Sequence, residues 1–178
     1  MSNCARKIFF ILLFFFTFHI SNAQNPQDSS SFVSMKEIIR QQADSMGYYF
    51  VQNDFNNYMK YQHPRLVKKL GGEQSLINIL NENVTKNGYQ AMSIFNDAPS
   101  KIIVTDTNLQ CTLPQKMIMK IGNTKLEILS TLICISYDNG KKWFFINASV
   151  PSSVLKEILP EISNELVIQE QQTHKINY

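Results

Sequence analysis

The sequence predicts an α+β fold in which amino-terminal helices pack on a curved antiparallel sheet. Two observations carry this prediction. Apolar residues recur at spacings of three and four through the first half of the chain, whereas the second half contains short runs with the period of strands. Two tight-turn signals, Gly122-Asn123 and Asp138-Asn139-Gly140-Lys141, join the longest strand candidates into an antiparallel meander. Helices followed by such a meander are typical of helices that cover one face of a sheet.

The amino terminus has the pattern of a secretory signal peptide. Arg6 and Lys7 form a basic head, residues 8–16 are apolar, and residues 21–23 place small residues three and one positions before a cleavage site. The apolar run is shorter than the ~20 residues that a membrane span needs, which disfavours the alternative of an uncleaved anchor. We therefore expect residues 1–23 to be a signal peptide, the protein to be secreted or periplasmic, and no membrane segment to remain after cleavage.

The mature chain is expected to hold one domain. Removal of 23 residues from 178 leaves 155, which is enough for a single core. The mature part has 15 Lys and Arg against 14 Asp and Glu, so its net charge is about +1 and no electrostatic argument for nucleic-acid binding remains. We predict a flexible tether over residues 24–31, a single α+β domain over residues 32–168 and a polar tail over residues 169–178.

The helical part of the domain begins at Phe32. The helical period runs from there toward Pro64, which is expected to end the helix because the residue before a proline resists helical geometry. Gly47 is expected to bend this long helix or to divide it in two. A short piece over residues 65–70 and a further helix over residues 73–85 complete the first half.

The second half contains five strand candidates and one late helix. The strands are expected over residues 90–95, 101–105, 109–121, 125–137 and 142–149. Pro151 suits the first turn of a short helix that Pro160 then closes.

Side-chain parity assigns the two faces of the meander. A two-residue turn at Asn139-Gly140 places Cys134 opposite Phe145, and the same register puts Trp143 on the same face. This face also carries an apolar set that we expect the helices to cover: Cys111, Leu113, Met117, Met119, Ile121, Leu126, Ile128 and Leu132.

The opposite face is also rich in large apolar side chains, among them Ile133, Ile135, Phe144 and Ile146. An exposed patch of this kind usually marks an interface. We therefore predict a homodimer through the sheet, with these four residues at the interface. The alternative, in which the carboxy-terminal segment folds over this face, is equally open from the sequence.

Cys111 and Cys134 are the two cysteines of the mature chain, and an exported protein passes through an oxidising compartment. Their side chains share a face on neighbouring strands, so a disulfide can form only if the two residues are directly opposed. A disulfide and a pair of buried thiols both stay open at this point. A redox role is disfavoured, because nothing nearby is expected to lower a thiol pKa.

Two segments, QNDFNNYMKYQHPRLV (52–67) and DNGKKWFFINAS (138–149), carry a family resemblance. With the Gly-Gly break between them, they resemble the nuclear transport factor 2-like superfamily, the cystatin-like cone that ketosteroid isomerases and polyketide cyclases share. The likeness spans about residues 33–150 and rests on the order of the elements and on the Asn-Asp-Phe and His-Pro pattern. It implies a pocket between the helices and the concave sheet, and frequent dimerisation through the sheet.

The resemblance points to residues that would surround such a pocket. The candidate ligand-binding residues are Tyr48, Tyr58, Met117, Met119, Trp143 and Phe145. Isomerase-type members pair a carboxylate base with a tyrosine, so Asp54 with Tyr58 or His63 is the corresponding catalytic candidate. Each has a structural alternative: Asp54 as a solvated or loop-bonding carboxylate, and His63 as a group that closes the end of the helix.

Two functional hypotheses follow. The first is an exported, non-enzymatic module that binds an apolar small molecule or a protein partner. The alternative is an isomerase- or cyclase-like enzyme with Asp54 as general base, and the two differ in whether Asp54 points into a closed apolar cavity. No metal or cofactor is expected, because His63 and His174 are the only histidines of the mature chain and neither lies at metal-ligand spacing.

Overall fold

The protein has an α+β fold, as the sequence predicts. A computed structural model describes residues 26–176, so the expected signal peptide lies outside the described residues. Its helices are α1 (Pro26–Val51), α2 (Phe55–Met59), α3 (Pro64–Lys69), α4 (Glu73–Thr85) and α5 (Ser152–Ile158). Its strands are β1 (Tyr89–Asn96), β2 (Ile103–Val104), β3 (Leu109–Ile121), β4 (Thr124–Ser136), β5 (Phe144–Asn147) and β6 (Gln172–Ile176).

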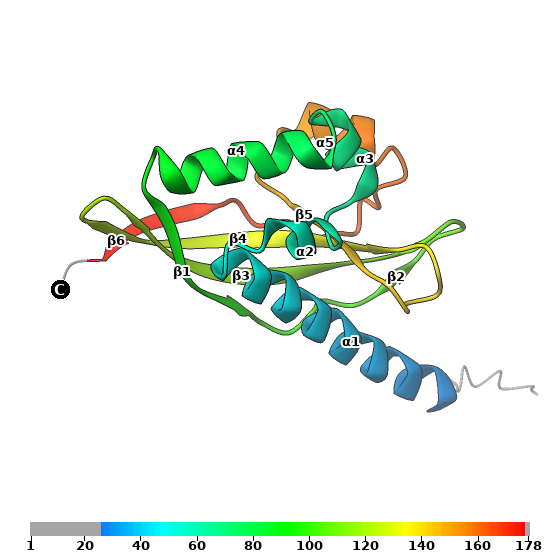
Figure 1. The fold of residues 1–178 in the computed structure, drawn as a ribbon. Helices are drawn as coiled ribbons and strands as arrows, with labels where there is room; N and C mark the ends of the chain where they lie inside the picture. The colour runs from blue at the N-terminus through cyan, green and yellow to red at the C-terminus, as the bar shows by residue number, and fades with distance from the viewer. Residues whose placement is uncertain (1–25, 177–178) are drawn as a thin grey trace, which may run out of the picture.

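The six strands form one antiparallel sheet that is not closed. Its main order is β1-β3-β4-β5, while β2 pairs with β3 and β6 pairs with β4 (Figure 1). The long strand β4 therefore pairs with β6 along its first half and with β5 along its second half. Figure 1 also shows α1 and α2 lying across the strands.

The first helix differs from the prediction at both ends. It begins at Pro26, so the prediction of a flexible tether is wrong for residues 26–31. Gly47 does not divide it; a side chain there would lie 3.0 Å from Ile94 Cγ2, so glycine lets α1 approach strand β1 closely. The chain instead turns at Asn53, whose φ of 58° lies in the left-handed region that asparagine tolerates.

Pro64 begins a helix where the sequence predicts that it ends one. It occupies the first turn of α3, and His63 before it is extended, with ψ at 125°. Both observations follow from the same steric rule, because a proline fits the first helical position while it restricts the residue in front of it.

The hairpin registers confirm the predicted turns. Ile121 pairs with Thr124 around Gly122-Asn123, and Cys134 pairs with Phe145 across the second hairpin. Asn139 and Gly140 both have positive φ, at 59° and 84°, as the Asn-Gly signal requires.

The face that carries Trp143 and Phe145 lies beneath α1, as predicted. Both side chains are fully buried, together with Ile39 and Ala43 of α1. The same core cluster includes Met46, Ile102, Leu109, Cys111, Leu113, Leu132 and Cys134. Burial of this apolar set on both elements is what fixes the helix against the sheet.

The opposite face is covered by the chain itself. Ile133, Ile135 and Ile146 are fully buried beneath Leu155 and Leu159 of the carboxy-terminal segment. The prediction that these three isoleucines form a dimer interface is therefore wrong, and the alternative in which the carboxy-terminal segment folds over them holds. Phe144, the fourth predicted interface residue, is half-buried beside the ring of His63.

The polar tail also differs from its prediction. Residues 172–176 form β6, which pairs with Lys125–Leu129 of β4. The first four side chains of this edge strand are exposed, including His174 and Lys175. The strand therefore lacks an alternating apolar pattern, and its sequence suggests a polar tail. Among residues 26–176, no helix combines the length and apolar character needed to cross a bilayer.

Candidate functional site

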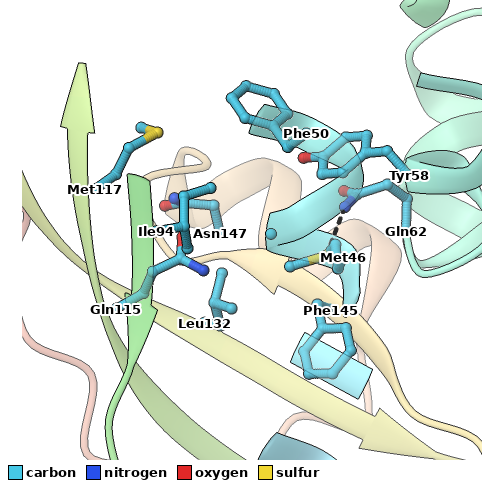
Figure 2. Close-up of a pocket in the computed structure, with 11 residues that line it drawn as sticks. Met46, Phe50, Tyr58, Gln62, Ile94, Gln115, Met117, Leu132, Phe145 and Asn147 are labelled. Carbon is cyan, nitrogen blue, oxygen red and sulfur yellow. Dashed lines mark hydrogen bonds between the residues drawn. The ribbon is translucent and has the colours of Figure 1, made fainter. Parts of the chain in front are cut away.

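A cavity of about 140 Å³ lies between α1, α2 and the inner face of the sheet (Figure 2). Its walls are Met46, Gly47, Phe50, Tyr58, Gln62, Ile94, Gln115, Met117, Leu132, Phe145 and Asn147. Cavities of about this volume in other proteins admit a molecule the size of benzene. The site therefore has room for a ligand of about one ring.

Three carboxamides give this cavity its polar character. Gln115 Nε2 donates to Asn96 Oδ1 at 2.9 Å, and Asn147 Oδ1 accepts from the backbone N–H of Ser149 at 2.9 Å. Gln62 Nε2 lies 3.2 Å from Met46 Sδ. Each contact holds one end of its amide, and a carboxamide has two donors and an acceptor. The walls can thus form further hydrogen bonds with a ligand.

Tyr58 adds a hydroxyl that stays protonated. Burial raises its pKa to about 12, because the phenolate would be poorly solvated there. Its ring lies 5.0 Å from that of Phe50, centroid to centroid, and Figure 2 shows the two on the side of the cavity away from Met117. With no charged side chain among its lining residues, the cavity is uncharged at neutral pH.

Three of the six residues predicted to bind a ligand line this cavity. They are Tyr58, Met117 and Phe145. Met119, two residues further along β3, lines a separate cavity beneath α4.

The remaining two predicted ligand-binding residues lie elsewhere. Trp143 is a core residue whose Nε1–H donates to the carbonyl of Gly140 at 3.0 Å. Tyr48 is 63% exposed on the outer side of α1, where it borders a shallow groove against β1. The prediction that these two line the cavity is wrong, because one is enclosed by core and the other faces outward.

The polar lining residues were missed by the sequence prediction, although a signal for one of them exists. Gln115 has the same parity as Leu113 and Met117 on β3, so it is a polar residue on an inward, otherwise apolar face. Burial of a polar side chain is costly unless it is hydrogen-bonded, so such a residue indicates a polar partner or a cavity beside it. Gln62 has no such signal, because it lies in the turn after α2 that bonds to Phe145 of β5.

Asp54 is the amino-terminal cap of α2. Its Oδ1 accepts from the backbone N–H of Asn57 at 3.2 Å, and its Oδ2 accepts from Asn57 Nδ2 at 2.6 Å. These hydrogen bonds lower the pKa of the carboxyl, which favours a permanently ionised group over a proton acceptor. Asp54 is not among the residues that line the cavity, so it is not placed to act as a general base there.

Replacing Asp54 with alanine is expected to lower the free energy of unfolding by about 1 kcal/mol, because α2 loses its cap. Asp54→Asn keeps a capping oxygen and should cost clearly less. Urea denaturation followed by circular dichroism measures both values. Ligand binding in the cavity should be unchanged in either variant, and a loss of binding in Asp54→Asn alone would show that the carboxylate charge has a role beyond capping.

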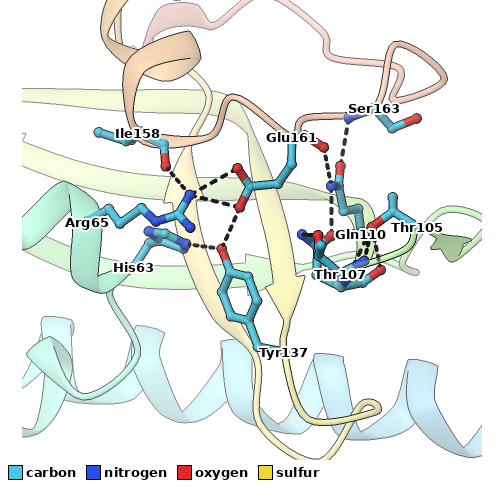
Figure 3. Close-up of polar contacts among 10 residues, drawn as sticks. His63, Arg65, Thr105, Thr107, Gln110, Tyr137, Ile158, Glu161 and Ser163 are labelled. Atoms are coloured by element: carbon cyan, nitrogen blue, oxygen red, sulfur yellow. Dashed lines mark hydrogen bonds and ion pairs between the residues drawn. The ribbon is translucent and has the colours of Figure 1, made fainter.

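His63 lies in a polar network on the other side of β5 (Figure 3). Its Nε2 is 2.9 Å from the Tyr137 hydroxyl, which in turn donates to Glu161 Oε1 at 3.2 Å. Arg65 pairs with the same carboxylate at 2.8 Å and also donates to the carbonyl of Ile158. His63 does not line the cavity; its network joins α3 to the carboxy-terminal segment.

Cys111 and Cys134 are directly opposed across β3 and β4, in the register that a disulfide requires. The structure describes both as free, fully buried thiols. Burial, with the adjacent Cys111, raises the pKa of Cys134 well above its usual value. The disulfide and the pair of buried thiols thus both stay open, and the raised pKa of Cys134 disfavours the thiolate that a redox reaction needs.

In protein refolded with oxidised glutathione, we expect the two thiols to lose their hydrogens and form the disulfide while glutathione is reduced. In the mature protein without Cys4, a thiol reagent added after unfolding should then label no cysteine, against two in protein reduced with dithiothreitol that is removed before labelling. In Cys111→Ala, the remaining Cys134 gives the single-thiol control. Two labelled thiols after oxidative refolding would show that the strands hold the sulfur atoms unbonded.

No family model matches the sequence, and no curated protein matches it significantly. In the part of the chain that the structure describes, no three His, Cys, Asp or Glu side chains are grouped so as to hold a metal ion. The fold and the site therefore define an α+β protein with an uncharged cavity between its leading helices and an antiparallel sheet.

Proposed function

We propose that this protein binds a small, uncharged molecule of about one ring in the cavity between α1, α2 and the sheet, and that it acts as a binding module without catalysis. The observation that carries the proposal is the cavity's composition: apolar walls, three carboxamides and one neutral hydroxyl. Sites of this kind hold a ligand by apolar burial and orient it with a few polar groups. A charged ligand would lose its hydration with no opposite charge to replace it.

Phenol is a suitable probe, because it combines one ring with one hydroxyl. Titration of the protein with phenol, followed by amide chemical shifts, should move the resonances of residues that line the cavity. Met117→Trp should abolish these shifts, since Met117 lines the cavity and a larger side chain would fill it. Met92→Trp is the matched control. It makes the same chemical change at an exposed position of β1 that lies outside the cavity.

Two outcomes would count against the proposal. If phenol at millimolar concentration shifts no cavity resonance in the wild type, the cavity does not accept a single ring. If Met117→Trp and Met92→Trp respond to phenol alike, the probe binds outside this cavity.

The proposal includes export and the family resemblance. The basic, apolar and small-residue pattern of residues 1–23 supports cleavage before Gln24, and mass spectrometry of the mature protein tests it directly. The order of helices and strands supports the resemblance to the nuclear transport factor 2-like cone, whose pocket lies between the same layers. Fold alone does not assign a ligand, so the cavity's own chemistry carries the functional argument.

A further inference from the structure

A second cavity of about 170 Å³ lies beneath α4. It is more apolar than the first: Leu80 and Val84 of α4 face Ala91 of β1 and Met119 of β3 across it. Asn53 and Asn83 are the amides among its lining residues.

The two cavities lie side by side on the same face of the sheet. Ile94 pairs with Met117 at the first cavity, and Ala91 pairs with Met119 at the second. Met117 and Met119 are successive inward positions of β3, so their Cα atoms are about 7 Å apart along the strand. A ligand a few atoms longer than one ring could therefore extend from the first cavity into the second if nothing stood between them.

Phe50 stands between them. It is the one residue that lines both cavities, and its ring is held by two aromatic neighbours: Phe55 at 5.8 Å and Tyr58 at 5.0 Å, centroid to centroid. Figure 2 shows its ring beside that of Tyr58 at the edge of the first cavity. These contacts favour one position of the ring over others.

We infer that Phe50 is a specificity-determining residue: its ring divides one chamber into two and limits the ligand of the first cavity to about one ring. This inference rests on the proposed function and adds the size limit of the ligand. Shortening Phe50 joins cavities of about 140 and 170 Å³ and admits a ring that bears an alkyl chain. The chain would lie against Leu80, Val84 and Met119.

The test compares phenol with 4-butylphenol by calorimetric titration. In the wild type, 4-butylphenol should bind no more tightly than phenol. In Phe50→Ala, affinity should rise by about fourfold for each methylene group that enters the second cavity. Phe50→Leu provides a less disruptive variant with an intermediate gain, and thermal melts followed by circular dichroism establish that each variant is folded.

Two further variants separate the size limit from other effects of the substitution. Tyr48→Ala removes an aromatic ring from the same helix at an exposed position outside both cavities, and it should behave as the wild type. Phe50→Ala combined with Val84→Phe refills the second cavity, so the alkyl gain should disappear.

The possible failures are distinct. The size limit is wrong, and the proposed function stands, if the wild type binds phenol and already binds 4-butylphenol more tightly. The same conclusion follows if the wild type binds phenol but neither Phe50→Ala nor Phe50→Leu gains affinity for 4-butylphenol over phenol. If no variant binds phenol, the proposed function fails and the size limit fails with it.

Discussion

Replacing Leu159 with alanine is expected to lower the free energy of unfolding by about 2–5 kcal/mol, the usual range for deleting a buried leucine side chain. Leu159 has no exposed surface and packs with Ile133, Ile135 and Ile146. The substitution should therefore remove apolar contacts and leave a cavity where the carboxy-terminal segment meets the sheet. Urea denaturation followed by circular dichroism gives the free energy of each variant.

Val167→Ala is the matched control for this prediction. Val167 lies in the same segment but is 74% exposed, so its loss should change stability by less than about 0.5 kcal/mol. A small effect at both positions would mean that the segment is not packed on the sheet in solution. The three isoleucines would then be free for the dimer that the sequence suggests, and analytical ultracentrifugation would detect it.

The sheet could be predicted from the sequence because its signals are local. Asn139-Gly140 and Gly122-Asn123 fix the hairpin registers through backbone geometry, and register fixes which side chains share a face. The turns place Phe145 on the same face as Cys134 and Trp143, and the apolar residues of that face indicate that the helices cover it.

The segment that covers the opposite face of the sheet could not be predicted in the same way. Ile133 and Ile135 require a partner surface, but a sister chain and a distant segment of the same chain satisfy that requirement equally. Gln110 offers a retrospective clue: this fully buried amide donates to the carbonyl of Glu161 and accepts from the N–H of Ser163, at 2.8 Å each (Figure 3). A buried polar side chain needs hydrogen-bond partners, and here the docked carboxy-terminal segment supplies them.

The candidate site was predicted only in part for a related reason. Parity places Met117 and Phe145 on the correct face, but the cavity exists only because α1 does not fill the space above them. The position of α1 depends on Gly47, which lets the helix lie close to Ile94. It also depends on the turn at Asn53 that positions Tyr58, and neither effect follows from a hydrophobic pattern.

His63 is expected to make the fold sensitive to acid. Burial lowers its pKa to about 4, helped by the positive charge of Arg65, while Glu161 opposes the shift. Because the Tyr137 hydroxyl donates to Glu161, His63 donates Nε2–H to the Tyr137 oxygen, and the ring is neutral. Its Nδ1 is then a buried acceptor without a hydrogen-bond partner in the described residues, so a proton added there would gain no compensating contact.

The direction of the effect follows from the two pKa values of the histidine. In the unfolded chain His63 titrates near its ordinary 6.5, whereas in the folded chain it titrates near 4, so the unfolded state binds the proton first. Stability is complete above about pH 6.5, falls as the pH drops toward 4, and levels out below that value. The total loss is about 3 kcal/mol, from 1.36 kcal/mol per unit of pKa.

Free energies of unfolding measured by urea denaturation at several pH values between 7 and 5 test this prediction. This range lies above the ordinary pKa of the carboxyl groups, so their titration contributes little to the slope. His63→Gln should be less stable than the wild type at pH 7 but should show an almost flat profile. His174→Gln, a change at an exposed histidine of β6, should keep the slope of the wild type. An equal slope in His63→Gln and the wild type would mean that other groups bind the proton, and that the pKa of His63 is the same in the folded and unfolded states.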